Sequence, residues 1–244
     1  FLADVRLGNG KRVTVHCPNP GAMLGLNEPG SPVILSDHKG KKRKLRYTLE
    51  TVSVVRAPLR GVPLTPFDAS RRSRDLLRAL SIVEGLALSP GRGKSVWVGV
   101  NTGRANDLAE GLLKANKIRD LRGFADIRRE VPVSKKTRLD FRLALRPLPA
   151  TRYCFLEVKS VTLARGNVGY FPDSVTERGT KHLNALMKLL RRPSRAALLF
   201  IVQRGDVRSV RPADDIDPEY GKALRRAAKA GVELYAYRFR VSPG

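Results

Sequence analysis

The fold of this chain is decided by two short segments, Arg138-Leu-Asp-Phe-Arg142 and Phe155-Leu-Glu-Val-Lys159. In both segments apolar residues alternate with polar ones, which predicts two β-strands. Because successive strand side chains point to opposite faces, Glu157 and Lys159 share one face of their strand. If Asp140 lies on a neighbouring strand, two carboxylates and a lysine converge. Such a group can hold a divalent metal and activate water against a phosphodiester.

The composition favours a polyanionic partner. The 244 residues are 42% hydrophobic, enough for one large or two small domains, and 47 Lys plus Arg against 22 Asp plus Glu give a net charge of +25. The basic residues occur throughout the chain, so nucleic acid is the natural counterpart, and the alternative is a soluble protein from an arginine-rich lineage. No segment approaches the roughly 18 apolar residues that cross a bilayer, so no membrane partner is expected.

The two cysteines, Cys17 and Cys154, lie far apart and lack the spacing of a zinc site. We expect both to be buried thiols in a reducing compartment. That compartment is the cytoplasm if the source is prokaryotic, with the nucleus or an organelle as alternatives in a eukaryote.

Residues 1–100 read as a small β-domain, with an oligonucleotide-binding-like (OB-like) barrel as one candidate. Asn9-Gly10 predicts a hairpin turn. A proline-rich, basic stretch at 56–94 resembles an insertion and contains a short helical candidate, Asp75–Gly85. The expected strands are 1–7, 11–17, 32–35, 45–55 and 95–100.

Residues 101–244 alternate between helical and strand patterns, which predicts an α/β domain with a central mixed sheet. The expected helices are 106–115, 175–192 and 218–230, the last of them closed by Gly231. The expected strands are 127–133 and 137–145, which could pair as a hairpin, then 153–161, 196–203 and 232–237.

A series of short motifs, in order along nearly the whole chain, resembles the sugar fermentation stimulation protein A family. The motifs are His16-Cys-Pro-Asn-Pro-Gly-Ala-Met23, Arg43–Tyr47, Gly99–Thr102, Arg138–Phe141, Glu157-Val-Lys159, Phe171-Pro-Asp173, Thr176–Gly179, Lys181-His182, Gln203-Arg204, Asp217–Tyr220 and Arg240–Pro243. The resemblance implies an N-terminal OB-like barrel, then a restriction-endonuclease-like domain of the PD-(D/E)xK class. Members of the family are described as DNA-binding and nuclease-like. The chain departs from the family at Pro20, where threonine is usual, in the 56–94 segment, and in an opening strand that it lacks.

Three residues carry the expected catalysis. Asp140 and Glu157 are assigned as ligands of Mg²⁺ or Mn²⁺, and Lys159 as the group that orients water or offsets developing negative charge. Glu110 could complete the metal shell, since nucleases of this class often use a glutamate on that helix. The alternatives are a surface ion pair for Glu157 and Lys159 and a solvated carboxylate for Glu110.

A second group of residues is expected to contact nucleic acid, partly because a helix N-terminus favours an anion. For several of them an ordinary solvated loop or a surface ion pair is the alternative, and Gln203 is either a further polar group of the site or a strand end. The expected contacts are His16, Asn19, Lys41, Lys42, Arg43, Lys44, Arg138, Thr176, Glu177, Lys181 and His182.

These observations predict a DNA-binding protein with a magnesium-dependent nuclease site. Two alternatives stay open: a non-catalytic DNA-binding regulator of sugar metabolism genes, and an RNA-binding or RNA-processing factor. Two carboxylates facing phosphate would weaken pure binding by repulsion, which favours chemistry. Homodimerisation is left open.

Overall fold

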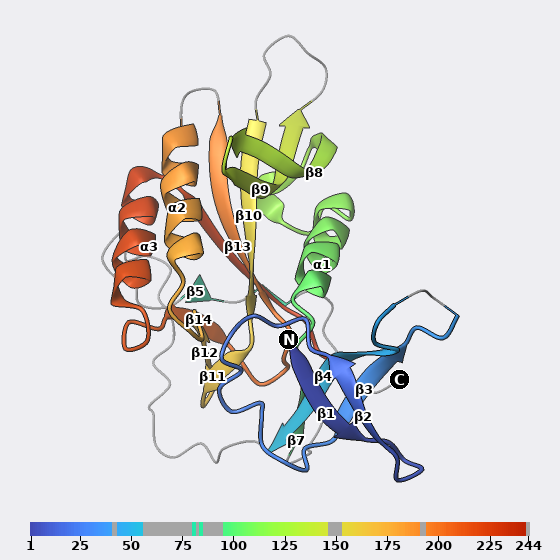
Figure 1. Ribbon diagram of the computed structural model, residues 1–244. Helices are drawn as coiled ribbons and strands as arrows, with labels where there is room; N and C mark the ends of the chain where they lie inside the picture. Colours follow the sequence, from blue (N-terminus) through green and yellow to red (C-terminus); the bar gives the residue numbers. More distant parts are fainter. Residues whose placement is uncertain are drawn as a thin grey trace.

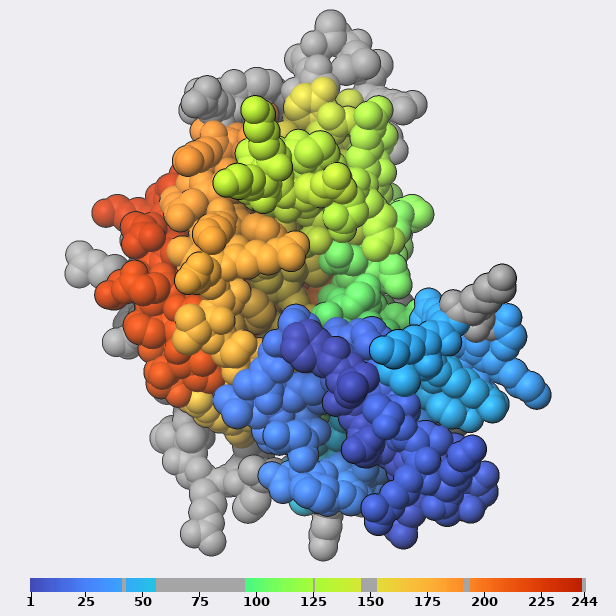
Figure 2. Space-filling model, viewed as in Figure 1, coloured from blue at the N-terminus to red at the C-terminus, as the bar shows by residue number. Residues whose placement is uncertain are grey.

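A computed structural model describes residues 1–40, 43–55, 80–81, 83–84, 95–145, 153–190 and 194–242. In these residues the chain forms an N-terminal sheet, a larger mixed sheet flanked by helices, and a small third sheet (Figure 1). The space-filling view shows the N-terminal residues lying directly against the helical and sheet residues of the second domain (Figure 2). No helix in the described part of the chain is long and apolar enough to cross a membrane.

The N-terminal sheet is built around one long strand that pairs with three others. The predicted hairpin is confirmed, with Gly10 in the left-handed conformation (φ 83°) that its turn requires. The buried core is almost entirely aliphatic and includes Cys17, so this cysteine is a buried free thiol as expected. The strands are β1 (Leu2–Arg6), β2 (Arg12–His16), β3 (Val33–Asp37), β4 (Tyr47–Val55) and β7 (Ser95–Gly99).

The central sheet is mixed, as predicted, in the order β6-β15-β13-β10-β9-β8. The first four strands run parallel and the last two form an antiparallel hairpin against β10. Strand β13 is buried along nearly its whole length because helices cover both faces of the sheet. The strands are β6 (Val83–Glu84), β8 (Phe124–Ser134), β9 (Thr137–Leu145), β10 (Tyr153–Val161), β13 (Arg195–Val202) and β15 (Glu233–Arg238).

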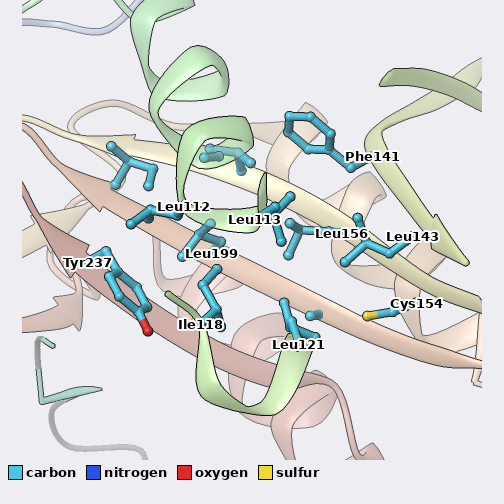
Figure 3. Close-up of a cluster of buried hydrophobic side chains, with 14 of the residues drawn as sticks. Leu112, Leu113, Ile118, Leu121, Phe141, Leu143, Cys154, Leu156, Leu199 and Tyr237 are labelled. Carbon is cyan, nitrogen blue, oxygen red and sulfur yellow. The ribbon is translucent and has the colours of Figure 1, made fainter. Parts of the chain in front are cut away.

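Helix α1 (Gly103–Lys114) covers one face of the central sheet, and α2 (Glu177–Leu189) and α3 (Pro218–Ala230) cover the other (Figure 1). On the α1 side, Leu112 and Leu113 pack with the 3₁₀ turn Arg119–Leu121 over the buried strand residues, including Cys154 (Figure 3). On the other side Leu183, Leu186 and Tyr220 form the second core. The two cores fix all three helices relative to the strand that carries Glu157.

A four-stranded third sheet was not predicted, because its strands are too short to show alternation. It consists of β5 (Leu80–Ser81), β11 (Leu163–Arg165), β12 (Val168–Phe171) and β14 (Ser209–Pro212). The helical candidate Asp75–Gly85 is wrong where it can be checked, since β5 and β6 are strands that pair with β14 and β15. The rest of that candidate, and most of the predicted insertion at 56–94, lie outside the described residues.

The two domains are joined by backbone hydrogen bonds as well as by side chains. The Gly99 N–H donates to the carbonyl of Gln203 (2.8 Å), and the Thr102 hydroxyl donates to the carbonyl of Pro18 (2.7 Å). An added Cβ at Gly99 would lie 2.7 Å from Oε1 of Gln203, so only glycine allows this approach. The N-terminal sheet is therefore held firmly against the end of the central sheet.

Candidate functional site

Asp140 lies where strands β9 and β10 separate. The last paired residues are Leu156 and Phe141, so the next step of the register sets Asp140 opposite Glu157. The Asp140 carboxylate accepts hydrogen bonds from the Val158 backbone N–H (2.7 Å) and from Nδ2 of Asn106 on α1 (2.9 Å). The side chain thus takes the place of a backbone acceptor, which fixes it beside the strand that carries Glu157.

Glu157 is almost completely buried, with 2% of its surface exposed. Its Oε1 accepts a hydrogen bond from Nζ of Lys159 (2.6 Å) and contacts Nδ1 of His182 on α2. Its Oε2 is also buried and has no hydrogen-bond partner among the described residues. The structure therefore brings together the three residues expected to be catalytic, and it adds a histidine and an unsatisfied carboxylate oxygen to them.

Burial and mutual repulsion change the acidity of the two carboxyl groups. Burial, followed by the negative charge of Glu157, raises the pKa of Asp140 from 3.8 to about 6, against the opposing hydrogen bonds from Val158 and Asn106. Burial also acts to raise the pKa of Glu157, but the hydrogen bond from His182 and the charge of Lys159 outweigh it and leave that pKa lowered. Glu157 is therefore the stable anion of the pair.

Glu110 lies one helical turn beyond Asn106 on α1, and its carboxylate is engaged elsewhere. It forms ion pairs with Lys114 (2.8 Å) and Arg129 (3.1 Å), and the Lys114 hydrogen bond lowers its pKa. The α1 side chain that contacts Asp140 is Asn106, which the sequence analysis missed. The available signal was the spacing, because residues four apart share a helix face and Asn106 is therefore as well placed as Glu110.

The residues expected at the start of α2 divide into structural and exposed groups. Thr176 caps the helix by accepting the Gly179 N–H (3.1 Å), and its own N–H donates to Asp217 (2.8 Å). Glu177 and Lys181 form an exposed pair at 3.4 Å, which is the ordinary surface interaction considered as the alternative. His182 is only 6% exposed, so the expectation that it contacts nucleic acid is corrected: the imidazole faces Glu157.

In the N-terminal domain the expected nucleic-acid residues also differ in exposure. His16 is exposed at the end of β2, and Arg43 and Lys44 are exposed before β4, whereas Lys41 and Lys42 lie outside the described residues. Asn19 is 4% exposed, so it is not an accessible contact. Its Oδ1 accepts the Gly21 N–H (2.9 Å) and shapes the turn that follows β2.

The turn after β2 contacts the second domain at Asp173. The Met23 N–H donates to Oδ2 of Asp173 (3.1 Å). A Cβ at Gly21 would overlap the Asp173 carboxylate, so this position requires glycine. Two motifs that are 150 residues apart in the sequence, one ending at Met23 and one at Asp173, therefore form a single contact between the domains.

Gln203 is buried at the end of β13, beside the strand that carries Lys159. Its Nε2 donates to Oγ of Ser160 (3.2 Å) and to the carbonyl of Asn101 (3.4 Å). Both side-chain contacts lie within the second domain, and the link to the N-terminal sheet is the backbone carbonyl of Gln203, which accepts the Gly99 N–H. The amide is therefore engaged in these contacts and is not free to face the carboxylates. Within the described ranges, no group of three or more His, Cys, Asp or Glu side chains is arranged to hold a metal ion.

The tip of the β8–β9 hairpin carries an exposed group of cations. Lys135, Lys136 and Arg138 are exposed, and none of them forms an ion pair with another described residue. Arg129 and Arg142, further down the hairpin, are paired with carboxylates. Within this hairpin, the cations without an ion pair among the described residues therefore lie at its end, two to five residues before Asp140 in the sequence.

Comparisons with known proteins agree with the order of the motifs. Residues 1–57 match a family model described as the SfsA N-terminal OB domain, and residues 103–244 match one described as the sugar fermentation stimulation protein RE domain. The curated sugar fermentation stimulation protein homologs of Geotalea uraniireducens and Pelobacter propionicus are 39% and 42% identical over 243 residues. Each alignment covers 100% of this chain and 87% of the relative.

The fold also resembles a solved structure of an SfsA protein. SfsA of Pyrococcus furiosus, solved in complex with Ca²⁺, superposes with a TM-score of 0.73 at 22% identity, covering 99% of this chain and 85% of that one. Together with the two family models, this likeness confirms the predicted order of an OB-like domain followed by a mixed α/β domain.

Proposed function

This chain belongs to the sugar fermentation stimulation protein family, and on that premise we propose that it binds DNA and hydrolyses phosphodiester bonds with the help of a divalent cation. The observation that carries the proposal is the unsatisfied Oε2 of Glu157 beside Asp140. A buried carboxylate oxygen without a partner is costly. Of the five buried side-chain atoms without a hydrogen-bond partner among the described residues, Oε2 of Glu157 is the only one that belongs to a carboxylate.

The residues of the site fit a hard, oxygen-preferring cation. Asp140 and Glu157 offer carboxylate oxygens and no soft ligand lies among their contacts, which suits Mg²⁺ or Mn²⁺. Mg²⁺ commonly takes only one or two carboxylates and completes its shell with water and phosphate, so a third acidic side chain is not required. The Pyrococcus relative in complex with Ca²⁺ supports a divalent cation in general.

Lys159 supplies the remaining chemistry from the protein side. Its ammonium is held against Glu157 and is 13% exposed, so it is fixed in position and still reaches the edge of the site. There it would orient a water molecule or offset negative charge that develops on the phosphate. When bound, a divalent cation neutralises phosphate charge and makes water easier to deprotonate.

The unpaired cations suggest where the phosphate backbone lies. Lys135, Lys136 and Arg138 offer three exposed charges on the hairpin that carries Asp140, and Arg43 and Lys44 add two on the N-terminal domain. None of these five cations has an acidic partner in the described part of the chain, so none gives up such an ion pair when it binds phosphate, and phosphate binding releases counterions from the nucleic acid. We assign these five residues to backbone contacts that carry no sequence information.

A second candidate is a DNA-binding regulator that does not cut. The net charge of +25 favours it, since binding alone would account for that excess. The two adjacent carboxylates count against it, because their charge would repel phosphate.

A cleavage assay separates the two candidates. The purified chain is incubated with end-labelled single- and double-stranded DNA and RNA in Mg²⁺, Mn²⁺, Ca²⁺ or EDTA. The proposal expects cleavage of DNA in Mg²⁺ or Mn²⁺ and none in EDTA. Binding without cleavage under every cation would establish the regulator, and cleavage of RNA alone would establish the processing factor.

A further inference from the structure

We infer that His182 is a positioning residue that fixes the orientation of the Glu157 carboxylate, so that Oε2 stays free for a cation; the cation part of this inference rests on the proposed function. His182 is 6% exposed and its Nδ1 contacts Oε1 of Glu157. It lies 3.4 Å from Nζ of Lys159, so the three side chains form one compact group.

The direction of the hydrogen bond follows from the chemistry of the partners. An ionised carboxylate only accepts hydrogen bonds. Nδ1 of His182 must therefore carry a hydrogen, and this N–H donates a hydrogen bond to Oε1 of Glu157. Lys159 donates to the same oxygen at 2.6 Å. Both donors therefore act on Oε1 and none acts on Oε2, which makes the two oxygens of one carboxylate unequal.

The difference between Oε1 and Oε2 of Glu157 persists only if a rigid donor holds the carboxylate in one orientation. The last torsion of a glutamate side chain is broad and nearly two-fold, so its oxygens exchange unless a partner holds them. Lys159 is a long side chain with rotatable donors and can follow the carboxylate as it turns. The imidazole ring of His182 has only two torsions, and its helix is tightly packed. His182 is therefore the group that can hold the orientation.

The packing of α2 supports the same role. Gly179, nearly one turn before His182, lies so close to α3 that a Cβ would be 3.0 Å from the Tyr220 ring. Leu183 and Leu186 are completely buried in the core beneath the helix. The helix backbone thus has little freedom to move, and the imidazole is delivered to Glu157 from a fixed position.

Two variants separate positioning from packing. His182→Asn keeps a donor, because the amide nitrogen is as many bonds from Cα as Nδ1. His182→Leu introduces an apolar side chain of similar size that has no donor. His182→Met takes its place if the leucine variant does not fold. Lys188→Asn, an exposed residue on the same helix, is the control.

Calorimetric titration with Ca²⁺ and crystal structures of the metal-free variants test the inference. We expect His182→Asn and Lys188→Asn to bind Ca²⁺ within about threefold of the parent, and the donor-less variant to lose about 10- to 100-fold, as is typical for groups that orient a metal ligand. In the crystal, the Glu157 carboxylate should turn only in the donor-less variant.

The Ca²⁺ titration and the crystal structures distinguish a failure of the proposed cation site from a failure of the inference about His182. A parent protein that binds no Ca²⁺ would refute the proposed cation site, and the Glu157 orientation in the crystals would still decide the role of His182. An unchanged Glu157 carboxylate in the donor-less variant, or equal losses of affinity in the asparagine and donor-less variants, would overturn the inference and leave His182 as a packing residue.

Discussion

Asp140→Asn should stabilise the metal-free protein while abolishing cleavage. The ionised Asp140 is unfavourable in the folded state, because burial and the charge of Glu157 raise its pKa from 3.8 to about 6. At about 1.36 kcal/mol per pKa unit, this corresponds to about 3 kcal/mol. Asparagine removes the charge and can keep both contacts: its oxygen accepts the Val158 N–H, and its amide donates to Asn106 once that side chain has flipped.

The sign of the pH dependence follows from the same values. A carboxyl group whose pKa is higher in the folded state does not lower the free energy of unfolding below pH 3.8, where it is protonated in both states. Above about pH 6 it is ionised in both states, and the free energy of unfolding is lowered by the full amount. We therefore expect the gain from Asp140→Asn to approach 3 kcal/mol at pH 8 and to fall to about half of that at pH 5. Urea unfolding in EDTA at both pH values measures the free energy of unfolding.

The matched control is Asp107→Asn on α1. Asp107 is an exposed carboxylate whose ion pair with Arg129 should contribute only a few tenths of a kcal/mol. If Asp140→Asn is less stable than the parent at pH 8, or if its effect does not change between pH 5 and pH 8, the electrostatic reasoning about the site is wrong.

Three further predictions follow from the contacts described above. Lys159→Ala should abolish cleavage while Ca²⁺ affinity changes only a few-fold, because Lys159 contacts Glu157 and is not an oxygen ligand; calorimetry and the cleavage assay check it, and cleavage at the parent rate would contradict it. Neutralising Lys135, Lys136 and Arg138 to Gln should reduce the slope of log affinity against log salt by about 2 to 3, measured by fluorescence anisotropy on labelled DNA, and an unchanged slope would show that these cations are merely solvated. Gly21→Ala should lower the free energy of unfolding by about 1 to 3 kcal/mol, because the new methyl group overlaps Asp173. Asp173→Ala should recover part of that loss in the double variant, and fully additive losses would refute the proposed overlap.

The convergence of Asp140, Glu157 and Lys159 could be predicted because it depends on local rules. Alternation along a strand fixed the shared face of Glu157 and Lys159, and a short antiparallel connection made Asp140 a neighbour. The three helices and most strands followed from periodicity and capping in the same way, although α2 (Glu177–Leu189) is shorter than the predicted 175–192 and α1 (Gly103–Lys114) begins before the predicted residue 106.

The partners of that group could not be predicted, because they come from helices on opposite faces of the sheet. Asn106 reaches Asp140 from α1, and His182 reaches Glu157 from α2. Helical spacing gives the face of a residue but not the level at which its turn meets the sheet. Glu110 was predicted because nucleases of the resembled class often use a glutamate on that helix, and this reason does not point to Asn106. The burial of Asn19 and His182 likewise depends on packing between distant segments.

Strand β7 has a consequence for how the two domains can be exchanged during evolution. It pairs with β4 along its whole length, and Gly99 at its end donates to Gln203 in the other domain. The matched family regions stop at residue 57 and resume at residue 103, so this strand lies between them. A recombination event that transplants either region alone would leave β4 without β7 as its neighbour, or leave the carbonyl of Gln203 without the Gly99 N–H that donates to it. Inheritance of the OB-like domain and of the second domain is therefore tied to the five residues of β7, which neither region contains.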